Sequence, residues 1–121
     1  MEINEHDRHL LKYIVEYCEM VKSSLQRFGE EFDIFVQDQD YLNSVSMSIM
    51  QIRELSGRLS PEFVAQTKEE MDWRMIKNMR NMFAHQYKSM DIEQIWDTAL
   101  NDVPVLGNYC QSLIEENESA E

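Results

Sequence analysis

Glycine and proline are scarce in this sequence, since its 121 residues include three Gly and two Pro. A β-sandwich or β-barrel of this length needs many tight turns, which use Gly, Pro, Asn and Asp. The composition therefore argues against such folds and favours a few long helices. The length suffices for one domain and is too short for two.

Cysteine and long apolar runs are also scarce. The two cysteines, Cys18 and Cys110, are too few for a disulfide framework, and both lie in apolar helical patterns. They are predicted to be buried free thiols in a reducing compartment. No run approaches the ~18 apolar residues of a membrane span, and the polar start MEINEHDRHL does not resemble a signal peptide. We therefore expect a cytoplasmic protein with no membrane partner.

Basic residues are outnumbered, with 11 Lys and Arg against 23 Asp and Glu and a net charge of −12. A generally basic nucleic-acid binder, with a pI above about 9, is excluded. The cations are unevenly placed, because residues 73–90 hold four of them and no acid. Either this window is a solvated helix face that pairs with acidic neighbours, or it is a local basic site.

Apolar residues recur every three or four positions, which predicts an all-α fold, an antiparallel bundle of four to five helices. Trp73 and Trp96 are expected to be core anchors. The expected helices cover residues 4–28, 40–59, 67 or 72 to 87, 91–100 and 104–114, with a short turn at 61–66 after the N-cap Ser60. The small serines of the second helix would let a neighbouring helix approach closely.

Several boundaries follow from local signals. Gly29 is expected to end the first helix, and residues 30–39 to form a connector held by aromatic side chains. The third long helix has two candidate starts: a capping box of Thr67 with Glu70, or Asp72. Residues 101–104 are expected to break the fourth helix and cap a fifth. The helical domain would cover residues 1–114, and residues 115–121 would form an acidic flexible tail.

The basic window has two different halves when it is placed on a helix at 100° per residue. One half is apolar and would pack in the bundle. The other half contains hydrogen-bond donors and one side chain that titrates near neutral pH: Arg74, Lys77, Arg80, Asn81 and His85. Arg and Lys bind phosphate oxygens, and His is a general acid or base near neutral pH. Arg74 and Lys77 are therefore expected to bind RNA phosphates.

Carboxylates are absent from this window, so it does not suit a two-metal nuclease, which needs clustered Asp and Glu ligands. It suits metal-independent RNA cleavage in which the 2′-hydroxyl of the substrate is the nucleophile. One chain offers a single Arg and a single well-placed His, whereas a two-fold dimer would supply two of each in one cleft. His6 and His9 form an HxxH pattern with no third ligand, and no metal or cofactor is expected.

The octapeptide Arg80-Asn81-Met82-Phe83-Ala84-His85-Gln86-Tyr87 matches the Arg-x4-His-x-Tyr motif of HepT-like proteins in the HEPN superfamily. The flanking sequence resembles this family as well. The similar segments are Met71–Arg74 before the motif, Asp91–Asp97 after it, and the Asp-apolar-Pro-x-Leu signature in Asn101–Leu106. Arg53 stands where the family usually has Gly.

The resemblance implies a helical bundle that forms a homodimer. It also implies that the protein is a toxin that cleaves RNA without a metal. Arg80 would position the phosphate, His85 would be the acid/base residue, and Asn81 would support both. An antitoxin partner, a nucleotidyltransferase of the MNT type, would transfer AMP to Tyr87 and block the cleft. Two alternatives remain: a non-catalytic HEPN nucleotide-binding or adaptor subunit of a nucleotidyltransferase, and an acidic helical interaction domain without an active site.

Overall fold

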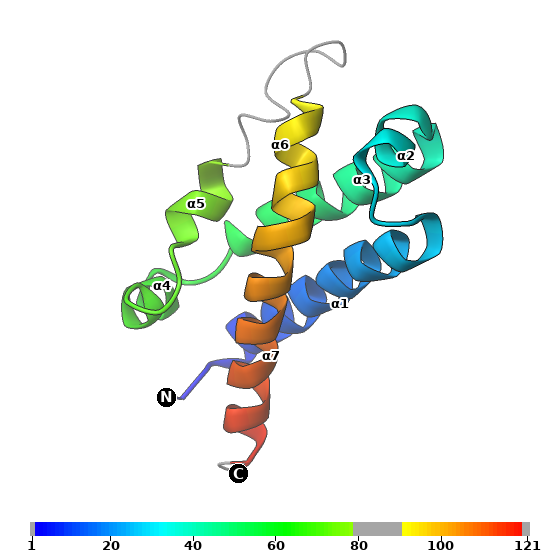
Figure 1. Cartoon of the computed structure of the whole chain (residues 1–121). Coiled ribbons are helices and arrows are strands. Elements are labelled where there is room, and N and C mark those ends of the chain that lie inside the picture. The colour runs from blue at the N-terminus through cyan, green and yellow to red at the C-terminus, as the bar shows by residue number, and fades with distance from the viewer. Residues whose placement is uncertain (1, 79–90, 120–121) are drawn as a thin grey trace.

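The computed structural model describes residues 2–78 and 91–119, and within these ranges the chain is helical with no strand. The predicted all-α bundle is confirmed. The elements in order are α1 (Glu5–Phe28), α2 (Phe32–Gln37), α3 (Gln39–Ser56), α4 (Pro61–Thr67), α5 (Trp73–Asn78), α6 (Ile92–Asp97), a π-helical segment (Thr98–Asp102) and α7 (Val103–Ser119). Figure 1 shows α1 and α3 side by side, and α6 and α7 form a column whose α7 part packs against α1.

The longest helix, α1, supplies one wall of the core. It begins after Asn4, whose side chain accepts a hydrogen bond from the backbone N–H of Asp7 at 2.7 Å. It ends at Gly29, where φ is +103°, a value that residues with a Cβ rarely adopt. The apolar residues that recur at spacings of three and four along this helix face the core: Leu11, Ile14, Cys18, Val21 and Leu25 are buried, and Phe28 is half-buried against them.

The second core wall is α3, which begins after the N-cap Asp38. Its Val45, Ile49 and Ile52 are completely buried. The predicted close approach at small residues is found where the hydroxyls of Ser24 on α1 and Ser44 on α3 lie 2.9 Å apart. Small side chains at this contact let the two backbones come close, which brings the apolar faces of both helices together.

The connector between α1 and α3 differs from the prediction because it contains a short helix, α2. Its expected aromatic anchoring is present: the rings of Phe35 and Trp96 lie 4.8 Å apart and those of Phe28 and Tyr41 also 4.8 Å apart. The Tyr41 hydroxyl donates to the carbonyl of Gly29 at 2.9 Å. Burial of the Phe35 ring against Trp96 explains why a short helix forms here, since a helix places Phe32 and Phe35 on the same face.

The predicted helix break at residues 101–104 is wrong. Figure 1 shows α6 continuing into α7 as one column, and the joining residues form a π-helical segment. The N–H of Val103 donates to the carbonyl of Thr98, five residues earlier. Pro104 has no N–H to donate, so the chain accommodates it by a wider turn.

The expected tail begins as helix, because α7 continues to Ser119. The side chain of Asn117 accepts a hydrogen bond from the N–H of Ile3 at 3.3 Å, and Glu118 lies 3.5 Å from Lys12. Both termini of the described chain therefore lie at one end of the molecule. In the described part of the chain, no helix is long and apolar enough to cross a membrane.

Candidate functional site

Some of the predicted site residues lie in the described part of the chain, and the others lie outside it. Arg80, Asn81, His85 and Tyr87 lie in residues 79–90, outside the described residues. Arg74 and Lys77 belong to α5, the helix that leads into this segment. Arg74 is 90% exposed and its Nε lies 3.7 Å from the carboxylate of Asp72. Its guanidinium is thus open to solvent, as phosphate binding requires.

The start of α5 decides between the two caps that the sequence offered. The helix begins at Trp73, and the Asp72 carboxylate accepts the N–H of Arg74 at 3.1 Å, so Asp72 is the cap. The expected capping box at Thr67 is wrong, because Thr67 is the last residue of α4. Its hydroxyl is buried and binds the indole of Trp73 instead. A buried indole N–H needs a partner, and this requirement outweighs the local capping signal.

The side chains of α5 give the helix a clear inner face. Trp73 and Ile76, three residues apart, are 8% and 1% exposed. The Trp73 ring packs 5.8 Å from that of Phe63 on α4, and α5 also lies against α3. Trp73 is therefore the core anchor that the sequence predicts, and Arg74 lies on the solvent side of the same helix.

The chain returns from residues 79–90 at α6. The predicted start is confirmed: Asp91 is the N-cap, and its carboxylate accepts the N–H of Gln94 at 3.0 Å. Ile95 is completely buried, and Trp96 joins the aromatic cluster of α2 and α3. Both helices that adjoin the motif segment are thus held in the core by apolar anchors next to their capped starts.

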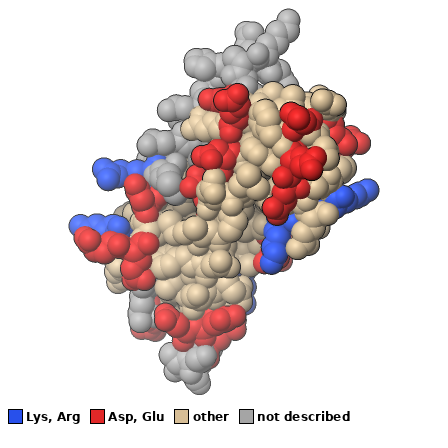
Figure 2. Space-filling view, viewed as in Figure 1, with Lys and Arg blue, Asp and Glu red and all other residues tan. Residues whose placement is uncertain are grey.

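Acidic side chains dominate the described surface. Figure 2 shows several clusters of Asp and Glu on the visible face, and Lys and Arg at fewer places. Exposed acids also adjoin the motif segment in sequence: Glu69, Glu70 and Asp72 before it, and Asp91 and Glu93 after it. Such a surface repels polyanions, so the bulk of the described surface does not suit a polyanionic ligand.

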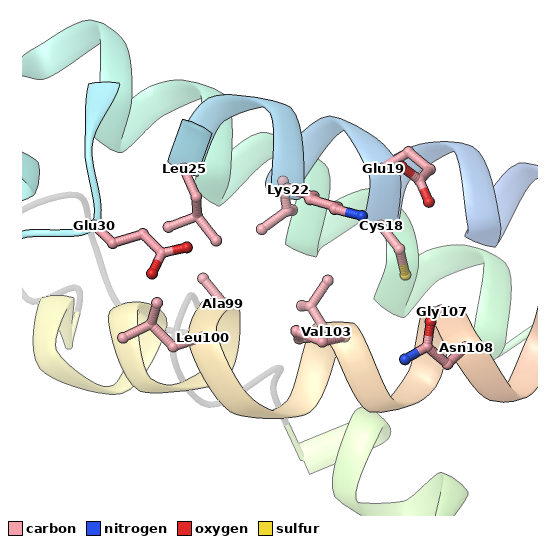
Figure 3. Close-up of a pocket in the computed structure, with 12 residues that line it drawn as sticks. Cys18, Glu19, Lys22, Leu25, Glu30, Ala99, Leu100, Val103, Gly107 and Asn108 are labelled. Carbon is pink, nitrogen blue, oxygen red and sulfur yellow. The ribbon is translucent and has the colours of Figure 1, made fainter. Parts of the chain in front are cut away.

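A groove of about 290 Å³ lies between α1 and the column of the π-helical segment and α7 (Figure 3). Its walls are only partly apolar, and its charged lining residues are Glu19, Lys22 and Glu30, which gives no preference for a phosphate. The Cys18 thiol also lines it, and burial together with the charge of Glu19 raises the pKa of this thiol to about 12. A protonated thiol is a poor nucleophile, so Cys18 does not suit a role as a catalytic nucleophile.

No group of three or more His, Cys, Asp or Glu side chains that could hold a metal ion occurs in the part of the chain that the structure describes. His6 and His9 contact other protein groups instead. The Nε2 of His6 lies 3.1 Å from the carbonyl oxygen of Arg58, and the His9 ring meets the edge of Tyr13 at 4.9 Å.

The sequence profile of the Ribonuclease HepT-like family matches residues 14–113 and so includes the motif Arg80–Tyr87. This chain belongs to the HepT-like ribonuclease family. The predicted family and enzyme class are confirmed, and the activity of the chain is that of a ribonuclease. None of the solved structures matches the chain significantly.

Three relatives have names that refer to RNase activity. A protein of Caldanaerobacter subterraneus subsp. tengcongensis, named "Putative RNase", is 25% identical over 92% of this chain and 96% of its own length. The "Probable ribonuclease HepT" of Thermococcus cleftensis is 25% identical over 81% of this chain and 93% of its own length. A "Putative RNase" of Methanocaldococcus jannaschii is 29% identical over 60% of each chain.

Sequence reasoning missed the buried polar residues that hold the elements before the HepT-like motif, namely Asp7 and Thr67. Asp7 is 2% exposed and Thr67 is fully buried. The signal for Asp7 was its helical spacing from apolar residues, since Ile3 lies four positions before it and Leu10 and Leu11 lie three and four positions after it. Thr67 carried a misleading signal, since it precedes a Glu at the spacing of a capping box.

Proposed function

We propose that this chain is a metal-independent endoribonuclease toxin of a HEPN/MNT toxin–antitoxin pair, active in the cytoplasm. The observation that carries the proposal is that the family match spans the whole Arg80–Tyr87 motif. The motif combines one phosphate-binding Arg with one acid/base His and no carboxylate. These groups suit cleavage that uses the 2′-hydroxyl of RNA as nucleophile.

The reaction needs one base and one acid on opposite sides of the phosphate. His85 of one protomer removes the proton of the 2′-hydroxyl, and the oxygen attacks the adjacent phosphorus. The bond to the 5′-oxygen breaks, and His85 of the second protomer protonates that oxygen. The products are a 2′,3′-cyclic phosphate and a 5′-hydroxyl. Arg80 binds the non-bridging oxygens, whose negative charge grows in the transition state, and Asn81 supports both residues.

The composite dimer site follows from stoichiometry, because each chain has one motif histidine. Two copies related by a two-fold axis place two motifs in one cleft. Arg74 and Lys77 extend the basic surface and bind the flanking RNA phosphates. The acidic remainder of the molecule limits non-specific RNA binding and offers a surface for a basic partner.

Cleavage of end-labelled RNA in excess EDTA tests the activity and its metal independence. We expect wild-type cleavage with cyclic phosphate ends, and a loss of ~10²-fold or more in His85→Ala and Arg80→Ala. His9→Ala is the matched control, because His9 is an exposed histidine on α1. A His85→Ala protein that cleaves as fast as wild type, or cleavage that requires Mg²⁺, contradicts the mechanism. Wild type that is inactive and harmless when expressed favours the adaptor alternative.

Mixed dimers test the composite site. Wild-type and His85→Ala chains with different tags are co-expressed in varied ratios, and activity is measured per total protein. If both histidines are needed, activity falls with the square of the wild-type fraction. A linear fall means that each chain cleaves alone and contradicts the dimer site.

Regulation by the partner rests on Tyr87. AMP transferred to its hydroxyl adds a phosphate that Arg80 can bind, and the adenosine fills the cleft. Intact-mass spectrometry after incubation with ATP and a nucleotidyltransferase encoded beside this chain is expected to show added AMP and lost activity. Tyr87→Phe should stay unmodified, whereas Tyr13→Phe is the control, since Tyr13 is 41% exposed. Modification that persists in Tyr87→Phe contradicts the assignment.

A further inference from the structure

Thr67 connects three segments through its hydroxyl and its carbonyl. The residue ends α4 and is completely buried. Its hydroxyl donates to the carbonyl of Phe63 and accepts the indole N–H of Trp73, both at 2.8 Å. Its carbonyl accepts the N–H groups of Glu70 and Met71, each at 2.9 Å. Thr67 thus ties α4, the loop 68–72 and the first residue of α5 together.

The described part of α5 is held in place by these contacts. Helices in proteins gain most of their stability from the packing of an apolar face. Trp73 and Ile76 face the core, whereas Arg74 is 90% exposed. The Trp73 indole therefore sets both the place of α5 and its rotation about the helix axis.

The helix that carries Thr67 is itself fixed at its other end. Ser60 caps α4, with its hydroxyl accepting the N–H of Phe63 at 3.2 Å. The buried carboxylate of Asp7 on α1 accepts the N–H and the hydroxyl of the same serine. A series of hydrogen bonds with buried partners therefore leads from the core helix α1 through α4 to α5.

We propose that Thr67 and Trp73 are positioning residues for RNA cleavage: their hydrogen bond fixes the helix whose last described residue, Asn78, precedes Arg80 by two positions. The inference rests on the proposed function, in which Arg80 holds the scissile phosphate. Transfer of a phosphoryl group needs reacting groups placed within a fraction of an ångström. Loosening α5 therefore lowers the rate of the chemical step more than it weakens RNA binding.

Three variants separate positioning from stability. Thr67→Val removes the hydroxyl at nearly constant shape, Thr67→Ser keeps it, and Ile14→Val changes a completely buried residue of α1. We expect Thr67→Val to lower kcat by ~10- to 100-fold with KM changed by less than ~3-fold. Thr67→Ser and Ile14→Val should stay within ~3-fold of wild type. Rates are compared at a temperature where circular dichroism shows each variant fully folded.

The indole ¹H–¹⁵N resonance of Trp73 reports the hydrogen bond directly, with the Trp96 resonance as internal reference. It should shift in Thr67→Val and stay in place in Thr67→Ser and Ile14→Val. Trp73→Phe, which removes the same N–H, gives the kcat comparison if Thr67→Val does not fold.

The outcomes distinguish this inference from the proposed function. A displaced indole resonance with unchanged kcat overturns the positioning role and leaves the ribonuclease mechanism intact. Equal losses of kcat in Thr67→Val and Ile14→Val show a general effect of stability and also overturn it. A His85→Ala protein with full activity overturns the proposed mechanism, and the inference then fails with it.

Discussion

The carboxylate of Asp7 accepts two hydrogen bonds from Ser60, 53 residues later in the chain. The backbone N–H of Ser60 lies 2.8 Å from Oδ1, and its hydroxyl lies 2.6 Å from Oδ2. Asp7 is 2% exposed. One acidic residue in the first turn of α1 therefore also fixes the start of α4, and the burial of the carboxylate makes both bonds costly to lose.

Asp7→Ala is expected to lower the free energy of unfolding by ~2–4 kcal/mol, because it removes a buried acceptor and leaves the N–H of Ser60 unpaired. Urea denaturation followed by circular dichroism measures the change. Asp40→Ala is the control, since Asp40 is an exposed acid in the first turn of α3. A loss in Asp7→Ala no larger than that in Asp40→Ala would show that the two bonds contribute little.

Gly107 of α7 lies against Cys18 of α1. A Cβ at this position would lie 3.0 Å from the Cβ of Cys18, whereas one at Gly57 would lie 3.5 Å from its nearest neighbour, the Arg53 carbonyl oxygen. Gly107→Ala is expected to destabilise by ~1–3 kcal/mol through overpacking. Gly57→Ala, at φ −68°, should stabilise by ~0.4–1 kcal/mol.

Thermal unfolding of both glycine variants checks this contrast. The clash at Gly107 involves the Cβ of Cys18, so adding Cys18→Ala should not restore stability. Gly107→Ala with wild-type stability would mean that α1 and α7 move apart at no cost.

Because two thiols are buried, the free energy of unfolding is expected to depend on pH in the alkaline range. Burial raises the pKa of Cys18 to about 12, and burial followed by the charge of Cys18 raises the pKa of Cys110. Both groups hold their protons more firmly in the folded state, so stability is full below pH 9.0, the ordinary thiol pKa. It falls as pH rises from there towards 12. Tyr41 and Tyr109, whose pKa values burial also raises to about 12, act in the same direction.

Urea unfolding between about pH 8 and pH 11 measures this dependence. A Cys18→Ala/Cys110→Ala variant should lose less stability over this range and should keep the part due to the tyrosines. The native thiols should also react slowly with iodoacetamide at neutral pH and rapidly in urea. Equal reaction rates in the two states would contradict the protection.

The exposed side chain of Arg74 allows a direct test of RNA binding. Arg74→Ala should weaken binding of a cleavage-resistant 2′-O-methyl RNA and reduce the slope of log K against log salt by ~0.7, the value for one phosphate contact with a single strand. Fluorescence anisotropy at several salt concentrations measures the slope. Lys12→Ala is the control, because Lys12 lies on α1 and pairs with Glu118 at 3.5 Å. An unchanged slope in Arg74→Ala would remove this residue from the RNA-binding surface.

The sequence by itself determined the helices α1 and α3, the stop at Gly29, and the caps Ser60 and Asp91. It also contained the motif Arg80–Tyr87, which identifies the family. These features are local: a helical face repeats every 3.6 residues, and a cap binds an N–H two or three positions away. A short window of residues therefore contains all the information that they need.

Tertiary structure decided the features that depend on distant partners. Thr67 could have capped a helix, but it ends one, because the buried indole of Trp73 takes its hydroxyl. Residues 101–104 could have formed a break, but α7 packs against α1 and a π-helical segment keeps the column continuous. Asp7 meets Ser60 only after α1 and α4 come together. Local signals at these positions allow two conformations, and the burial of polar groups and apolar faces far along the chain selects one.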